Sequence, residues 1–139
     1  MAALNPYLIF NGNCEEAFNF YKSVFGVEFQ MISKFKDIPG HECPVGDENK
    51  IMHVALPIGK DGDLLMGSDS GMGEVTIGNN FAISVSASSE EETKKFFNGL
   101  SEGGKITMPL ASTFWSPLFG MLTDKYGVDW MLGVNNQQS

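Results

Sequence analysis

The feature that most constrains this fold is one order of sequence patterns that occurs twice along the chain. In each half, a short apolar run is followed by a turn, an apolar stripe at helical spacing and three further strand-like runs. The first runs span 6–10 and 80–86, and the helical stripes follow at 14–25 and 90–102. A β-α-β-β-β order that occurs twice predicts an α+β fold built from two related modules.

The two halves align at a regular spacing. Asn13 and Ser89 each stand where a helix cap is needed, with a glutamate three residues later, and they are 76 residues apart. The turns that begin at Gly59 and Asp124 are only 65 residues apart. This spacing is shorter because the first half carries a longer charged loop at 37–50. The alternative is two unrelated α+β segments, since identity between the halves is slight.

The modules divide the chain into 1–70 and 80–139, joined by a glycine-rich linker at 71–79, and together they form one structural domain. One such module covers a single face of its sheet with its helix. Two modules set edge to edge predict a curved mixed sheet with a central cavity and with the helices outside, and we expect the function in that cavity. The remaining strands are expected at 27–33, 51–58, 63–68, 105–110, 119–123 and 128–134.

Composition excludes several classes of protein. Nine Lys+Arg against 17 Asp+Glu give a net charge of −8 without a basic cluster, which argues against a nucleic-acid partner. No apolar run is long enough to span a membrane, and the N-terminus lacks a signal-peptide pattern, so we expect a cytoplasmic protein. Cys14 and Cys43 are expected to be free thiols.

Several motifs resemble the vicinal oxygen chelate superfamily, which includes glyoxalases, bleomycin-resistance proteins and extradiol dioxygenases, and most closely its PhnB-like branch. The resemblance spans almost the whole chain and implies a two-module fold and a homodimer, often one that exchanges modules. It implies much less about the reaction, which is poorly defined in this branch. The residues that carry it are Pro6-Tyr7-Leu8, 11–13, 15–17, Phe20-Tyr21, Phe25-Gly26, Met52-His53, 66–69, 107–110, Phe114-Trp115 and 119–130.

The resemblance also implies a divalent metal, held by His and Glu side chains on the first and last strands of each module. In this chain the four corresponding runs, 6–10, 64–67, 81–86 and 130–132, contain no His, Asp or Glu. Side chains without suitable lone pairs cannot bind such an ion. The sequence therefore predicts no metal, and because no glycine-rich nucleotide fingerprint follows a strand, it predicts no other cofactor.

Few residues are candidates for chemistry. His53 is the one histidine within a predicted strand, where an imidazole serves either as an acid/base or ligand-holding group or as a satisfied core side chain. His41 lies in the charged loop and is expected to be solvated. Cys14 follows a helix cap but has no evident partner, which favours an inert thiol. Asp69 and Asp124 are expected to accept backbone hydrogen bonds at turns.

Four large side chains are candidates for the lining of the cavity. Alternation along a strand sends every second residue to one face, so each of these residues either lines the cavity or packs in the core. With His53 they form the predicted ligand-binding set: Met66, Phe114, Trp115 and Trp130.

These observations predict a metal-free, dimeric protein that binds a small apolar or aromatic molecule. The alternative is a glyoxalase-like lyase or isomerase, or a dioxygenase-related enzyme, with His53 as acid/base or ligand. A third possibility is a structural dimer whose cavity is closed by Trp130 and its neighbours. The flexible linker favours a dimer made by exchange of modules.

Overall fold

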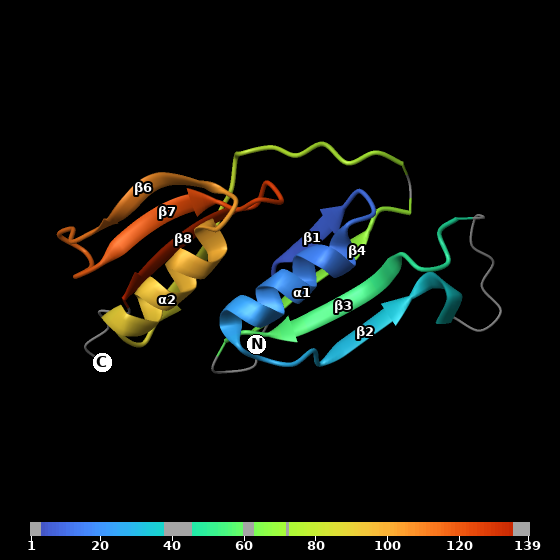
Figure 1. Ribbon diagram of the computed structural model, residues 1–139, viewed down its shortest axis with the longest axis horizontal. Coiled ribbons are helices and arrows are strands. Elements are labelled where there is room, and N and C mark those ends of the chain that lie inside the picture. Colours follow the sequence, from blue (N-terminus) through green and yellow to red (C-terminus); the bar gives the residue numbers. More distant parts are fainter. Residues whose placement is uncertain (1–3, 38–45, 60–62, 72, 135–139) are drawn as a thin grey trace. The chain divides into compact units, whose positions relative to one another are not determined.

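The computed structural model describes residues 4–37, 46–59, 63–71 and 73–134. The chain divides into two compact units, Met1–Thr76 and Ile77–Ser139, and this division falls inside the predicted linker. Each unit has the order β-α-β-β-β, and its four strands form one mixed sheet (Figure 1). The α+β class and the two modules are confirmed, whereas the shared cavity stays a prediction.

The first unit pairs its first and last strands in parallel and its other strands antiparallel. Its sheet has the order β1-β4-β3-β2. The elements are β1 (Tyr7–Phe10), α1 (Cys14–Phe25), β2 (Met31–Lys34), the 3-10 turn η1 (Phe35–Asp37), β3 (Ile51–Pro57) and β4 (Leu64–Asp69).

The second unit repeats this topology with the sheet order β5-β8-β7-β6, in which β5 and β8 are parallel. Neither described helix is long and apolar enough to cross a membrane. The elements are β5 (Ile83–Ala87), α2 (Glu90–Ser101), β6 (Lys105–Ala111), β7 (Phe119–Thr123) and β8 (Asp129–Val134).

Two strands begin later than predicted. The run 27–33 is a strand only from Met31, and the run 80–86 only from Ile83. In the first case the intervening residues contact α1: Lys22 pairs with Glu28 at 3.1 Å and lies 5.2 Å from the ring centroid of Phe29. The segment after α1 therefore passes along the end of the helix before it joins the sheet.

The two helix caps differ from each other. The Ser89 hydroxyl accepts a hydrogen bond from the Glu92 N–H at 3.1 Å, which confirms the predicted cap of α2. Asn13 makes no side-chain cap bond, so its predicted role is wrong. The carboxylate of Asp69 instead accepts the N–H groups of Gly12 and Cys14, each at 2.9 Å. A residue from the end of β4 thus caps α1 across the unit.

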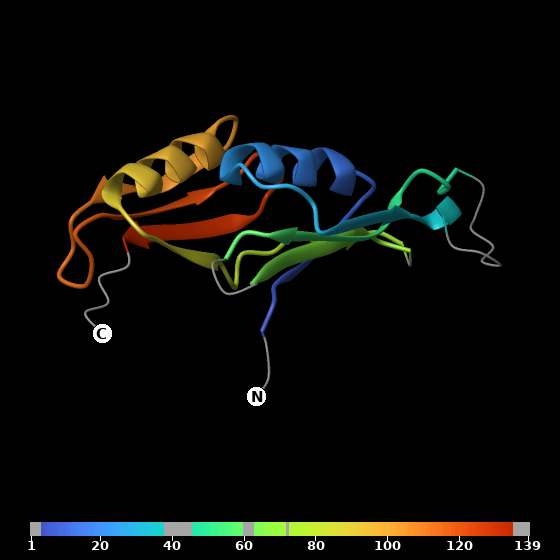
Figure 2. The ribbon, with the colours of Figure 1, turned by 90° about the horizontal axis from the view of Figure 1, so that it is seen from below.

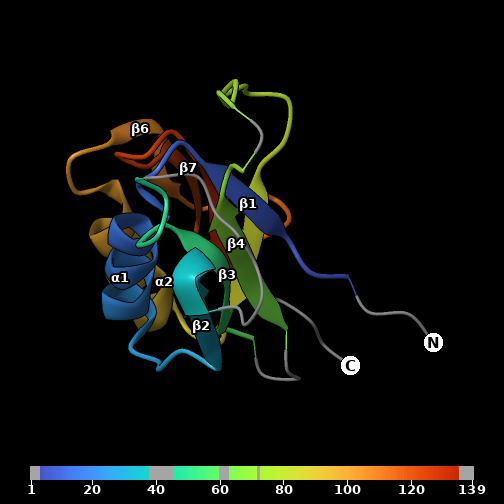
Figure 3. The same cartoon turned by 90° about the vertical axis from the view of Figure 1, so that its right-hand side faces the viewer.

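Helix α1 packs on one face of the first sheet (Figure 3). Leu8, Val54 and Gly67 lie side by side across β1, β3 and β4 on this face. A Cβ atom on Gly67 would stand 2.7 Å from the Phe18 ring of α1 and 2.7 Å from the Leu8 carbonyl oxygen. The glycine therefore lets the helix approach the sheet closely.

A β-bulge changes which side chains of β3 face the helix. Ser33 pairs with His53, but the next residue of β2, Lys34, pairs with Ile51, so Met52 is the extra residue. An extra residue reverses the alternation of faces beyond it. Ile51 and Val54 are consequently both fully buried although they are three residues apart.

In the second unit, too, a glycine lets the helix approach the sheet closely. A Cβ atom on Gly120 of β7 would stand 2.7 Å from the Phe97 ring of α2. Leu132 pairs with Gly120 and Trp130 pairs with Leu122, and Trp130 and Leu132 have no exposed surface. Each helix therefore covers one face of its own sheet (Figure 2).

Candidate functional site

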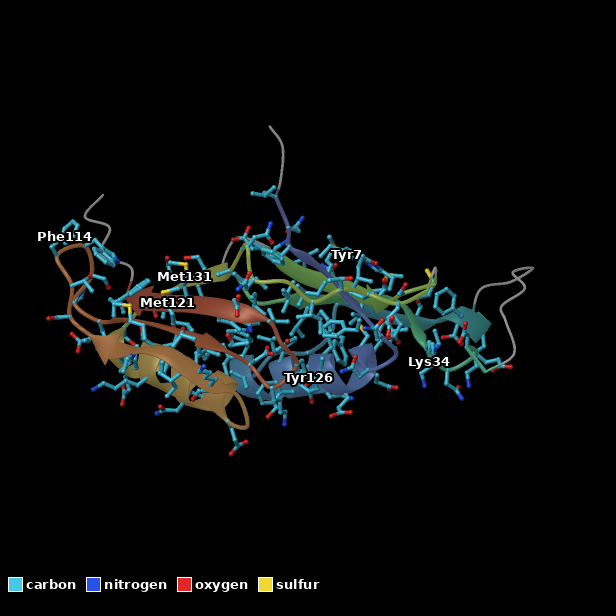
Figure 4. The ribbon with its side chains drawn as sticks, turned by 90° about the horizontal axis from the view of Figure 1, so that it is seen from above. Tyr7, Lys34, Phe114, Met121, Tyr126 and Met131 are labelled. Atoms are coloured by element: carbon cyan, nitrogen blue, oxygen red, sulfur yellow. The ribbon has the colours of Figure 1, made fainter. Side chains whose placement is uncertain are left out.

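The face of the first sheet opposite α1 carries large apolar side chains that no described helix of this unit covers. Tyr7 is adjacent to the inward-facing Leu8 and points away from α1 (Figure 4). The exposed fractions of Tyr7, Ile9 and Met31 are 43%, 52% and 47%. We call the set Tyr7, Ile9, Met31, His53 and Met66 the first open face.

Sheet register places His53 and Met66 on this face. Met66 pairs with Tyr7 on one side and with Ala55 on the other, while His53 is adjacent to the buried Val54. These two predicted site residues are thus brought to the same face. The sequence signal for Tyr7 and Ile9 was present in the alternation of β1, in which Leu8 and Phe10 are buried and the other two residues are exposed.

Tyr7 and His53 form the polar centre of the first open face. The phenol oxygen lies 3.2 Å from His53 Nδ1, and the two rings are stacked with centroids 5.6 Å apart and an interplanar angle of 28°. Among the described residues, nothing forms a hydrogen bond with His53 Nε2. The pair therefore leaves one ring nitrogen for an external partner.

A second polar atom near this pair lacks a partner. Ser33 pairs with His53 across β2 and β3, and its hydroxyl oxygen is buried without a hydrogen bond to any described residue. Buried hydroxyls are normally paired, and an unpaired one costs about 1–3 kcal/mol. The Ser33 hydroxyl and His53 Nε2 both lack a hydrogen-bond partner among the described residues. This favours a water or a polar atom of a ligand beside them.

The face of the second sheet opposite α2 is lined largely by sulfur and aromatic groups. Met121 pairs with Met131 and with Met108, which puts three thioethers in one row across β6, β7 and β8. Met121 and Met131 point away from α2 (Figure 4). We call Met108, Met121, Met131, Phe119 and Trp115 the second open face.

Trp115 and Phe114 extend the second open face from the loop before β7. The Trp115 ring meets Phe119 edge-on, with centroids 5.4 Å apart, and Phe114 meets Trp115 at 4.8 Å. Phe114 is 95% exposed and Trp115 is 49% exposed. The Thr113 hydroxyl accepts the N–H groups of Trp115 and Ser116, which orders the loop that presents both rings.

Trp130, the remaining predicted site residue, lies in the core of the second unit. It has no exposed surface, and its indole N–H donates to Asp124 Oδ2 at 2.9 Å. Its neighbour Met131 takes the position on the open face. This placement does not favour Trp130 as a ligand-binding residue, and sequence alternation alone did not say which of the two residues faces inward.

Two carboxylates are buried among the described residues, and both are occupied by structural hydrogen bonds. Asp124 accepts donors of its own turn, as predicted, whereas the described donors to Asp69 are distant in sequence and do not belong to the linker. Asp124 accepts the N–H groups of Tyr126 and Val128, at 2.8 and 3.0 Å. In addition to capping α1, Asp69 accepts the Ile51 N–H at 2.8 Å. Because these oxygens face N–H donors, neither carboxylate is placed to serve as a catalytic group.

The Cys14 thiol is fully buried at the start of α1. Burial raises the pKa of this thiol far above its usual range, and the charges of Asp69 and Glu15 raise it further. The thiol form is therefore maintained, as expected for an inert cysteine. Cys43 and His41 lie outside the described residues.

The raised pKa of the Cys14 thiol predicts that the stability of the protein depends on pH. Above about pH 8.5 an unfolded cysteine loses its proton while folded Cys14 keeps it, so the free energy of unfolding falls by about 1.4 kcal/mol per pH unit. Urea denaturation at pH 8.5 and 9.5 should show this extra loss in the wild type but not in Cys14→Ala. Parallel pH profiles for the two proteins would contradict the assignment.

The open-face donors do not fit a divalent metal. On the first and last strands of the modules, where the superfamily resemblance places the ligands, the open faces carry Tyr7, Met66, Ser84, Met131 and a single carboxylate, Asp129, which accepts the Thr123 hydroxyl at 2.6 Å. Thioether, phenol and aliphatic hydroxyl groups are poor ligands for such ions. Across the described ranges, no group of three or more His, Cys, Asp or Glu side chains could hold a metal.

A polar hollow of about 310 Å³ lies in the first unit beside the start of α1, and none of the residues of the first open face line it. Lys50 lines it and pairs with Asp47 at 2.8 Å, and the pKa of Lys50 is raised chiefly by this hydrogen bond. With Glu74 also on its wall, the hollow has no excess of positive charge for an anion. We therefore take the open faces as the candidate site.

Comparisons with known proteins agree with this architecture. Residues 2–133 match the family described as 3-demethylubiquinone-9 3-methyltransferase. The chain is 33% identical to protein YjdN of Escherichia coli (strain K12) over 144 residues, with 97% of each protein covered. It is 39% identical to protein PA1353 from Pseudomonas aeruginosa. Superposition on the crystal structure of that protein covers 97% of this chain and 98% of the PA1353 chain, with a TM-score of 0.85.

Other solved structures extend the likeness. The PhnB protein from Bacillus cereus is 34% identical, with 96% and 100% of the two chains covered and a TM-score of 0.77. A glyoxylase/bleomycin resistance protein/dioxygenase domain from Frankia sp. EAN1pec, 10% identical with 98% of each chain covered, has a TM-score of 0.70 and shares the fold alone. The same holds for the fosfomycin resistance protein FosX from Listeria monocytogenes, at 11% identity, 99% and 96% coverage and a TM-score of 0.67. Two β-α-β-β-β modules and these matches place the chain in the 3-demethylubiquinone-9 3-methyltransferase family, to which the PhnB protein is similar, with a fold shared by the glyoxylase/bleomycin resistance protein/dioxygenase domain.

Proposed function

We propose that this protein is a metal-free binding protein for a small apolar or aromatic molecule, which binds against an open sheet face. The observation that carries the proposal is the exposure of Tyr7, Ile9 and Met31 on one continuous face, at 43%, 52% and 47%. Contiguous exposed apolar surface of this kind marks a binding site rather than ordinary surface.

The chemistry of the faces supports an aromatic guest. Thioethers are flexible and polarisable, and they contact aromatic rings favourably. Met66 on the first open face and Met121 and Met131 on the second supply such groups, while Phe114 and Trp115 supply flat apolar walls. The proposal therefore keeps Met66, Phe114 and Trp115 as lining residues.

We also propose a homodimer. Edge strands expose unpaired backbone groups that favour pairing with another chain, and β1, β2, β5 and β6 are all edges of their sheets. A partner chain would cover such an edge, by simple contact or by exchange of modules through the linker. A net charge of −8 argues against a nucleic-acid partner, and a cytoplasmic location stays a prediction.

An enzyme is the second candidate function, because His53 Nε2 has no partner among the described residues. An imidazole on an apolar face suits proton transfer beside a carbonyl, as in a lyase or isomerase. We do not extend the methyltransferase name of the family to this chain, since no glycine-rich nucleotide loop follows a strand in its sequence.

Thermal denaturation with acetophenone, a small aromatic ketone, tests the binding function. We expect the probe to raise Tm, because a ligand at ten times its Kd adds about 1.4 kcal/mol to the free energy of unfolding. Replacing Ile9 with lysine should abolish this rise, since the probe would have to desolvate a charge on the first open face.

Ile32→Lys is the matched control. Ile32 lies on the same sheet, pairs with the inward-facing Val54 and is 37% exposed, so it is on the opposite side from Ile9. This variant should bind the probe as the wild type does. If the probe leaves the wild-type Tm unchanged, or if both lysine variants lose the shift equally, binding at the open face is refuted.

A further inference from the structure

We propose that Tyr7 holds His53 in one tautomer, so that His53 donates its Nε2–H to a carbonyl oxygen of the bound molecule. This inference rests on the proposed binding function and adds the chemical class of the ligand. It assigns a positioning role to Tyr7, which acts through His53.

The direction of the hydrogen bond between Tyr7 and His53 follows from their chemistry. A phenol O–H is a good donor, and its oxygen lone pairs are partly delocalised into the ring, whereas the unprotonated nitrogen of a neutral imidazole is a good acceptor. At a separation of 3.2 Å, the phenol O–H of Tyr7 therefore donates to Nδ1 of His53. The bond made by one ring nitrogen decides the state of the other, so Nε2 carries the proton.

The surroundings restrict what Nε2–H can meet. Among the described residues no acceptor bonds to it. On the face, Ile9 and Met66 offer no oxygen or nitrogen, whereas Ser68, which pairs with Ile9 and lies between β1 and β3 on β4, carries a hydroxyl. The nearby hydroxyl of Ser33 is buried and unpaired. A fixed donor on a face with large apolar side chains and a few hydroxyls selects a molecule with an apolar body and a hydrogen-bond-accepting oxygen.

The stacked geometry makes the arrangement rigid. The rings of Tyr7 and His53 lie at 28° with centroids 5.6 Å apart, and both residues stand on strands of one sheet. Stacking and the hydrogen bond together limit rotation of the imidazole. Donors fixed in place before binding cost less entropy when the ligand arrives.

The first arm of the test reads the tautomer in the free protein. The chain has two histidines, so a long-range proton–nitrogen NMR spectrum at pH 8 contains two imidazole patterns, and His53→Phe assigns one of them. We expect Nε2 of His53 to show the shift of a protonated nitrogen and Nδ1 that of an unprotonated acceptor. In Tyr7→Phe the Nδ1 signal should move toward that of a free lone pair. A protonated Nδ1 in the wild type would overturn the inference.

The second arm compares acetophenone with α-methylstyrene, in which a CH2 group replaces the carbonyl oxygen and the number of non-hydrogen atoms is the same. The ratio of their Kd values should shift against acetophenone by about fivefold in His53→Phe, which keeps the stacked ring but loses the donor. If both probes bind and the ratio does not change, the inference fails while the binding function stands. If neither probe binds the wild type, the binding function itself fails and the inference falls with it.

Discussion

Replacing Asp69 with alanine is expected to lower the free energy of unfolding by about 3–5 kcal/mol. The side chain is 3% exposed and accepts three backbone N–H groups, from Gly12 and Cys14 at 2.9 Å and from Ile51 at 2.8 Å. Alanine leaves these donors unpaired and removes the cap of α1. Asp69→Asn keeps one acceptor oxygen and should give an intermediate loss.

Urea denaturation measures this effect, and Asp63→Ala is the control because it removes the same charge from an exposed position just before β4. We expect Asp63→Ala to stay within about 0.5 kcal/mol of the wild type. A loss below about 1 kcal/mol for Asp69→Ala would show that the three hydrogen bonds do not hold the unit together.

Replacing Trp130 with alanine should destabilise the protein by about 3–5 kcal/mol. The residue is completely buried between the second sheet and α2, and it pairs with Leu122 across the sheet. The substitution opens a large cavity and also takes the indole donor from Asp124. Trp130→Phe should cost less, since it keeps most of the packing and removes the hydrogen bond.

Trp115→Ala tests whether the two tryptophans have different roles, Trp130 in the core and Trp115 on the open face. Trp115 is 49% exposed, so its removal should change the free energy of unfolding far less than removal of Trp130. Each variant leaves a single tryptophan, whose fluorescence follows unfolding in urea. Equal losses of stability in the two variants would contradict the assignment of Trp130 to the core and Trp115 to the face.

Local patterns predicted most of the fold. The apolar stripes, the turn glycines and the serine cap depend on neighbours in the sequence, so α1, α2 and the Ser89 cap were predicted correctly. The cap of α1 was not predicted, because the capping residue, Asp69, is 55 positions from Cys14 in the sequence. A contact of this length leaves no signal in the spacing of nearby residues.

The faces of the strands were the least predictable part of the site. A shift of one residue exchanges the two faces, and sequence reasoning chose Trp130 where Met131 stands on the open face. The bulge at Met52 adds a further reversal, which decides that Ile51 faces inward while His53 faces outward. The Tyr7–His53 pair depends on the parallel pairing of β1 with β4, which brings together residues 46 positions apart.

Methyl NMR of protein labelled at isoleucine and methionine tests the central claim most directly, because the labelled residues lie on both sides of the sheets. Addition of acetophenone should shift the signals of Ile9 and Met66 on the first open face and leave those of Ile32 and Ile106, which lie on the helix side of their own sheets, unchanged. Shifts confined to Ile32 and Ile106, or no shift at saturating probe, would contradict the claim that the open faces form the binding site.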